Sequence, residues 1–311
     1  MLKRKSFLRA IAGLAFSLLC STSIAACQPT NAGSNTKNGE KGIGVVSPAK
    51  SSEQQKQPDP LFEIEAALQT AKPGEYVLCP SRQFYDRAVK NGIEKSTFIF
   101  YAAKMVEVGE QESKVANLAG RKYSIPNQLI ISIPPKQECN KGDIVLTWWQ
   151  SGSGMQRAIV VGGTKTEPVV RYLDITLDNP SGWGKKEESL KPDSFLVLNK
   201  PWQIGTAVAI QQGRNTKHGL ILAATDEHVL VRGFAGRVSC HDRNNITSIP
   251  AIPNVVAGDI AMAAWHGSFK PVTVTKVDKE IGRVYTNFQL ARKDQEKVVP
   301  FGDLYKKPAD K

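Results

Sequence analysis

The sequence predicts an all-β protein built from several small, similar units. A short motif, in which a glycine and usually an acidic residue precede a strand-like run, recurs four times along the 311 residues, at intervals of about 60 residues. Between these motifs the chain has short alternating runs rich in Val, Ile, Thr and aromatic residues, interrupted by Gly and Asn. Such runs are typical of strands. A third observation, an export signal at the N-terminus, places the folded part outside the cytoplasm.

The composition excludes several classes of protein. Hydrophobic residues make up 41% of the chain and charged residues 23%, which excludes wholly disordered, fibrous and multi-spanning membrane proteins. Of the formal net charge of +12, four units lie in residues 1–26, which leaves +8 on the rest. These basic residues are scattered, so they indicate either a solvated basic surface or weak attraction to polyanions such as wall polymers. No nucleic-acid partner is expected.

Residues 1–26 have the pattern of a secretory signal peptide. Basic residues at positions 3, 4, 5 and 9 precede an uncharged, mostly apolar stretch over residues 10–26. Its end, residues 24–27 (Ile-Ala-Ala-Cys), resembles the lipobox of bacterial lipoproteins. The resemblance implies that Cys27 receives diacylglycerol and starts the mature chain, so that acyl chains hold the protein at a membrane. An ordinary signal peptide with a chance cysteine is the alternative.

The residue after Cys27 bears on the location. In Gram-negative lipoproteins an Asp at this position tends to retain the protein in the inner membrane, and here the residue is Gln28. The resemblance therefore implies an outer-membrane protein, facing either the periplasm or the cell surface.

Two segments precede the first strand motif. Residues 27–60 consist mainly of Asn, Ser, Gly, Lys, Gln and Pro and are predicted to form a disordered tether, because they cannot bury enough apolar surface to fold. An extended segment packed on the folded body is the alternative. Leu61, Ile64 and Leu68 then have helical spacing, and residues 72–74 (Lys-Pro-Gly) form a stop, which predicts a short helix over residues 61–68.

Each copy of the motif is expected to begin a unit of several strands. The motifs occupy residues 74–78, 142–146, 205–209 and 258–262. Second strands are expected at 86–89, 156–161, 218–222 and 271–274, and third strands at 169–174, 229–234 and 283–288. The units end in polar-to-apolar segments at 125–129, 189–192, 245–250 and 298–304. The predicted units are residues 61–136 (with the short helix), 137–199, 200–252 and 253–311.

The order of these elements resembles the Tudor domain, a member of the Src-homology-three-like class of small barrels. The match is best in the second unit, where residues 142–143 (Gly-Asp), 157–158 (Arg-Ala) and 172–174 (Tyr-Leu-Asp) fall in the family's order. It is weakest in the first unit, where residues 96–108 are longer and compatible with a helix, and in the third. The resemblance implies tandem five-stranded barrels. A single β-sandwich of similar strand content is the structural alternative.

The same resemblance implies where a ligand would bind. Tudor-type barrels commonly hold a cationic ligand in a cage of aromatic rings, whose faces attract positive charge. The candidate ligand-binding residues are Trp148, Trp149 and Tyr172 in the second unit and Trp265, Tyr285 and Phe288 in the fourth. Packing in the barrel core or between units is the alternative. Since Trp148 and Trp149 are adjacent on a strand, they point to opposite faces, and at least one should lie outside its own core.

No catalytic, metal or cofactor motif is found. The sequence has no nucleophile elbow, phosphate loop, His-Glu-x-x-His motif or dinucleotide fingerprint. His218, His228, His241 and His266 lack the close spacing of structural zinc ligands. Cys79 with a distant histidine is weak evidence for a nucleophile. We therefore predict no catalytic residue, no metal and no cofactor.

The remaining cysteines leave the redox state open. Beyond Cys20 in the signal peptide and Cys27 at its end, the chain contains Cys79, Cys139 and Cys240. In an oxidising compartment these give one disulfide and one free thiol, in any of three pairings, or else three buried reduced thiols.

The sequence as a whole favours a lipid-anchored cell-envelope protein that acts as a non-catalytic binding or scaffold module. Its expected ligands are an envelope protein or an envelope polymer, bound through surfaces of the tandem barrels, because linked weak sites gain affinity from effective concentration. Two alternatives remain: an envelope hydrolase that uses Cys79 or a C-terminal histidine, and a purely structural spacer.

Overall fold

The protein is mostly β-sheet. A computed structural model describes residues 64, 69–175, 187–289 and 294–306, and these described residues belong to one compact unit. The predicted signal peptide, Cys27 and the predicted tether lie outside the described residues, as does the helix predicted over residues 61–68 except for Ile64, which is buried.

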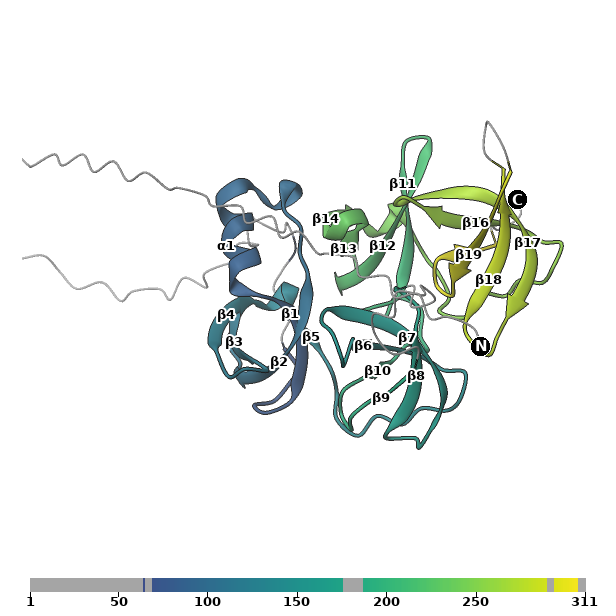
Figure 1. Cartoon of the computed structure of the whole chain (residues 1–311). Coiled ribbons are helices and arrows are strands. Elements are labelled where there is room, and N and C mark those ends of the chain that lie inside the picture. The colour runs from purple at the N-terminus through teal and green to yellow at the C-terminus, as the bar shows by residue number, and fades with distance from the viewer. Residues whose placement is uncertain (1–63, 65–68, 176–186, 290–293, 307–311) are drawn as a thin grey trace, which may run out of the picture. The chain divides into compact units, whose positions relative to one another are not determined.

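The described strands form four groups of five (Figure 1). The first group contains β1 (Tyr76–Pro80), β2 (Phe100–Glu107), β3 (Glu112–Asn117), β4 (Lys122–Pro126) and β5 (Ile131–Ser132). The second contains β6 (Ile144–Trp148), β7 (Met155–Gly163), β8 (Pro168–Tyr172), β9 (Glu188–Ser189) and β10 (Leu196–Val197). The third contains β11 (Ala207–Gln212), β12 (Asn215–Ala224), β13 (His228–Gly233), β14 (Val238–Asp242) and β15 (Ile246–Ser248). The fourth contains β16 (Ile260–Trp265), β17 (Ser268–Asp278), β18 (Arg283–Phe288), β19 (Gln295–Pro300) and β20 (Leu304–Tyr305).

All four groups share one strand order. In each sheet the fourth, third, second, first and fifth strands of the group follow one another, and the pairs are antiparallel. The third and fourth groups are joined into a ten-stranded sheet by one pairing between β12 and β17, where Lys217 lies opposite Ser268. The predicted strands that begin units two, three and four, and the second and third strands of these units, are confirmed.

The sheets are not closed barrels. Among the described strands, the fourth and fifth strands of a group do not pair with each other, and the fifth strand pairs only with the first. The fifth strands are two or three residues long, too short to bridge both neighbours.

The recurring glycine has the same geometry in every group. Gly74, Gly142, Gly205 and Gly258 have φ angles of 92°, 94°, 89° and 92°. Each amide donates a hydrogen bond of 2.8–2.9 Å to a carbonyl in the second strand of the same group. That strand is irregular just beyond the acceptor residue. A positive φ strains any residue with a Cβ atom, which explains why glycine recurs.

Two of these glycines predict a graded loss of stability. Gly142→Ala should destabilise the fold by about 1–2 kcal/mol through backbone strain alone, since a Cβ atom there meets nothing within 4 Å. Gly205→Ala should cost more, because its Cβ would lie 2.7 Å from Cδ2 of Leu146 in the second group. Urea unfolding measures the loss of stability of each variant. Equal losses would contradict the prediction, because they would show that the side chain of Leu146 moves aside without cost.

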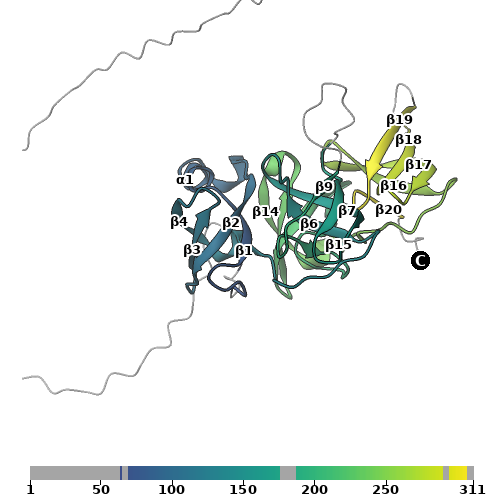
Figure 2. The same cartoon turned by 60° about the horizontal axis from the view of Figure 1, so that its bottom comes forward.

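The first group departs from the prediction. Residues 86–89 were expected to form its second strand, but they lie in helix α1 (Arg82–Asn91), which buries Tyr85 and Ala88. A pair between Arg82 and Asp86, 2.7 Å apart and one helical turn from each other, supports this helix. The helix contacts β4, where Arg82 Nη1 donates to the carbonyl of Ser124 at 3.1 Å (Figures 1 and 2).

The second strand of the first group is β2, which lies within the segment that looked compatible with a helix. Phe100, Ala102, Ala103 and Met105 are buried there, and the pairing with β1 and β3 satisfies the backbone. Insertion of α1 between β1 and β2 therefore makes this unit longer than the others.

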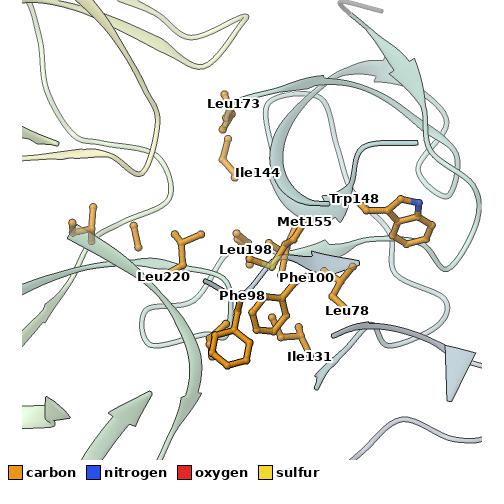
Figure 3. Packing of buried hydrophobic residues seen from close by; sticks show 14 of the residues in the cluster. Leu78, Phe98, Phe100, Ile131, Ile144, Trp148, Met155, Leu173, Leu198 and Leu220 are labelled. Atoms are coloured by element: carbon orange, nitrogen blue, oxygen red, sulfur yellow. The ribbon is translucent and has the colours of Figure 1, made fainter. Parts of the chain in front are cut away.

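The core is shared between the groups. One cluster of buried hydrophobic residues includes members from all four groups, such as Leu78, Met155, Leu220 and Leu304. Figure 3 shows part of it, with Phe100 of β2 near Met155 of β7. Two smaller clusters are local to the second and third groups. Contacts between groups therefore contribute to stability along with the packing inside each group.

Candidate functional site: a polar cavity between strand groups

A buried arginine joins the second and fourth groups. Arg157 in β7 has a side chain that is only 4% exposed, and its guanidinium contacts two carboxylates. Its Nε donates to Asp174, two residues after β8, at 3.0 Å, and its Nη2 donates to Asp303, in the turn before β20, at 2.7 Å. The backbone amide of Arg157 also donates to Asp174 at 2.7 Å. Two carboxylates thus neutralise one buried cation.

A histidine brings the third group into the same cluster. Nε2 of His218 in β12 lies 3.0 Å from Oδ1 of Asp303, and the His218 amide donates to the carbonyl of Gly267 at 3.1 Å. Gly302 allows the close approach of Arg157, since its φ is 80° and a Cβ there would lie 2.5 Å from Nη1 of Arg157. We call Arg157, Asp174, Asp303 and His218 the polar cluster.

The electrostatics of the cluster favour charged groups. Burial alone would raise the pKa of Asp303, but the charges of Arg157 and His218 hold it well below its ordinary range. Burial alone would lower the pKa of Arg157, yet Asp174 and Asp303 outweigh this effect and raise it. At neutral pH the guanidinium and the Asp303 carboxylate are therefore both ionised.

A cavity of about 680 Å³ opens beside the polar cluster. All four members of the cluster line it, together with Arg232 of β13 and Arg283 of β18. Its apolar wall includes Met155, Leu173, Leu220, Phe234 and Val298. The volume is that of a small-ligand site, and the charged side chains in the lining suit a polar ligand.

The two further arginines are anchored by backbone carbonyls. Arg283 donates to the carbonyls of Leu173 at 2.7 Å and Tyr172 at 3.0 Å, which ties the fourth group to the second. Arg232 donates through Nε to the carbonyl of Phe98 at 3.3 Å, which ties the third group to the first. The cavity therefore lies where hydrogen bonds connect the strand groups.

A second cavity, of about 500 Å³, lies between the first and second groups. It is lined by α1, by residues 117–119 and by residues 152–154, and its aromatic side chains are Phe84, Tyr101, Tyr123 and Trp148. None of the described residues that line it is an Asp, Glu, Lys, Arg or His.

Two of the predicted ligand-binding aromatics are in the core. Tyr172 is 1% exposed, and its hydroxyl donates to Glu188 at 2.7 Å and accepts from the Gln150 amide at 3.0 Å. Phe288 is fully buried, with its ring centroid 5.1 Å from that of Trp265. Neither ring presents an open face, so neither can form part of a solvent-facing cage.

The other four rings lie in different environments. Trp148 is buried and packs 5.1 Å from Tyr76 of the first group, while the neighbouring Trp149 is half-buried. Lys297 lies 5.3 Å from the ring centroid of Trp265, and Lys276 lies 5.2 Å from that of Tyr285. The chain's own lysines therefore already lie over the last two rings. Tyr285 lines the larger cavity and Trp148 the smaller one.

Cys79 and Cys139 lack the properties of nucleophiles. Cys79, Cys139 and Cys240 form no disulfide with one another. Burial raises the pKa of Cys79 to about 12, and its Sγ lies 3.6 Å from the Tyr123 hydroxyl. Burial likewise raises the pKa of Cys139 to about 11. Both are thiols at neutral pH, whereas a nucleophile must be a thiolate.

Two searches of the described residues gave negative results. No group of three or more His, Cys, Asp and Glu side chains within the described ranges is arranged to hold a metal ion. No helix in this part of the chain combines the length and apolar character needed to cross a membrane.

The polar cluster was not predicted, although the sequence holds a signal for it. Arg157, Arg232 and Arg283 lie inside predicted strands among apolar residues, and a charge in such a position needs a partner when it is buried. Asp174 ends the predicted strand 169–174, and Asp303 lies in the predicted final segment 298–304 of the fourth unit. Which acid meets which arginine depends on the packing of the groups, since Arg157 and Asp303 are 146 residues apart.

Comparison of the sequence with known proteins found no match. No protein-family model matches the chain, and no curated protein is significantly similar to it in sequence. Its function must therefore be argued from its own residues.

Proposed function

We propose that the chain is a lipid-anchored protein of the bacterial cell envelope whose folded body is a non-catalytic binding module. In this proposal residues 1–26 are a signal peptide, Cys27 carries the acyl chains, residues 27–60 are the tether, and the protein resides at the outer membrane. The strand groups are Tudor-like units, and the cavity beside the polar cluster holds a group from an envelope polymer or protein. The lipobox residues 24–27 support the anchor.

One observation carries the choice of binding over catalysis. The described residues that line the larger cavity include no Ser, Thr or Cys. His218 and Asp303 form the pair that a hydrolase would use as base and orienting acid, yet this described lining offers no Ser or Thr hydroxyl and no thiol for His218 to activate. Asp303 also contacts Arg157, so it is part of a structural ion cluster.

The common strand order supports the Tudor-like interpretation. Four groups with one strand order and one positive-φ glycine turn are most simply explained as copies of a single ancestral unit. The described units differ mainly in their loops and insertions, of which α1, between β1 and β2, is the largest described example.

Replacement of Cys27 tests the anchor. In a Gram-negative host, Cys27→Ser should move the protein from the membrane fraction to the soluble fraction and abolish incorporation of radiolabelled palmitate, because acyl chains supply the membrane affinity. Cys20→Ser is the matched control and should leave both properties unchanged. Retention of Cys27→Ser in the membrane together with label on another residue would contradict the assignment.

Co-sedimentation with purified cell-wall sacculi tests the binding function. The full-length chain should be retained by sacculi at low salt and should stay bound at high salt. Salt screens the interactions of charges inside a partly buried cavity less than those of charges scattered over the surface. Retention that disappears with salt would leave only the basic charge as an explanation. An absence of retention at both salt concentrations would contradict binding to the wall and would favour a spacer.

A further inference from the structure

We propose that the larger cavity recognises a carboxylate group of its ligand through the guanidinium of Arg232. This inference rests on the proposed function and deepens it, because it names the chemical group that the binding site selects.

Arg232 is a half-buried cation without a carboxylate partner among the described residues. Its one hydrogen bond within the described part of the chain is the 3.3 Å contact from Nε to the carbonyl of Phe98, and this leaves both Nη groups available. No described carboxylate lies within ion-pair distance of it, whereas Arg157 has two. Burial lowers the pKa of Arg232, an effect that Asp174 opposes and Arg157 reinforces. An anion bound beside Arg232 would therefore relieve an unfavourable charge.

One further polar atom in the cavity lacks a partner. Oε1 of Gln156 is buried and has no hydrogen-bond partner within the described structure. Gln156 lines the same cavity as Arg232. Buried polar atoms are normally hydrogen-bonded, so this unpaired acceptor points to a polar ligand that donates to it.

The guanidinium of Arg232 favours a carboxylate over other groups. Arg232 carries one positive charge with no described carboxylate within ion-pair distance, and one carboxylate group of a ligand balances that charge. The planar fork of a guanidinium also matches the two oxygens of a carboxylate.

The rest of the ligand would contact the apolar wall. Met155, Leu220 and Phe234 line the cavity, and Phe234 is 60% exposed, so an uncharged body attached to the carboxylate can reach them. We therefore expect a carboxylate joined to an apolar or peptide-like group.

A matched pair of probes tests the proposal. Binding of N-acetylphenylalanine and of its neutral amide is measured by NMR shifts of the full-length chain, for the wild type, Arg232→Gln and Arg237→Gln. Arg237 is exposed and lies outside the cavity lining, so it controls for loss of one positive charge. The wild type and Arg237→Gln should bind the carboxylate about tenfold more tightly than the amide, and Arg232→Gln should bind both equally.

Other outcomes would overturn the proposal. It fails if Arg232→Gln keeps the tenfold preference, if the carboxylate does not bind the wild type, or if inorganic phosphate displaces it more effectively than acetate does. Arg232→Lys keeps the positive charge and loses the planar fork of the guanidinium, so it should prefer the carboxylate over the amide by an intermediate factor. If Arg232→Gln does not fold, Arg232→Lys decides the question. A preference of Arg232→Lys equal to that of the wild type then overturns the proposal.

Sacculus binding of the wild type separates this proposal from the proposed function. If the wild type binds sacculi but does not prefer the carboxylate probe, the carboxylate inference alone fails. If it prefers the probe but does not bind sacculi, wall binding alone fails.

Discussion

Replacing Arg157 with Met is expected to destabilise the folded protein by about 3–5 kcal/mol, because it leaves two carboxylates without their cation. Arg157 is nearly fully buried, while Asp174 and Asp303 are 23% and 20% exposed. Water can therefore solvate the acids in part, which places the expected loss at the lower end of the range. The measurement is urea unfolding at pH 7, compared as midpoints and slopes.

The matched control for this prediction is Arg82→Met. Arg82 contacts Asp86 at 2.7 Å and donates to the carbonyl of Ser124 at 3.1 Å, both at exposed positions, so its loss should cost about 1 kcal/mol or less. If the two variants lose similar stability, the polar cluster does not stabilise the contact between the strand groups. The double variant Arg157→Met with Asp303→Asn should recover part of the loss, because one uncompensated charge is gone.

Stability should fall steeply in acid, and Asp303→Asn should remove part of this dependence. The pKa of Asp303 is depressed in the folded state, so the carboxylate stabilises the fold above the pKa of the unfolded chain, about 3.9. This contribution is lost as the pH falls through the lower folded pKa. The variant should be less stable than the wild type at pH 7, by about 2–3 kcal/mol, and the difference should shrink toward pH 2.

Thermal or urea unfolding at intervals between pH 7 and pH 2 measures this difference. Asp226→Asn is the control, because Asp226 is exposed and lies outside the polar cluster, and its curve should follow that of the wild type. A constant difference between Asp303→Asn and the wild type at all pH values would show that the charge of Asp303 does not carry the effect.

Much of the fold could be predicted from the sequence because strand patterns are local. A few residues are enough to show the alternation of apolar and polar side chains in β7, β13 and β18. The same is true of the glycine before the first strand of each group. α1 was missed because residues 86–89 were matched to strands of the other units, although Tyr85 and Ala88 have helical spacing. Closure into barrels could not be judged from the sequence, since it depends on pairing between short strands far apart in the chain.

The site was predicted less well for the same physical reason. Aromatic residues attracted attention as ligand contacts, but Tyr172 and Phe288 fill the core, where large rings contribute most burial. The cavity is formed by side chains from the second, third and fourth groups, and its polar cluster connects residues that no local pattern links. Only the packing of the groups brings Arg157, His218 and Asp303 together.

The most direct test of the central claim is amide hydrogen exchange of the full-length chain, free and bound to solubilised wall fragments. Binding in the cavity beside the polar cluster predicts added protection at residues 155–157, 218, 220, 232–234, 264, 266 and 267, which come from three strand groups and line that cavity. Protection confined to α1 and residues 117–119, which line the smaller cavity, would contradict the account. So would an unchanged exchange pattern in the presence of saturating fragments.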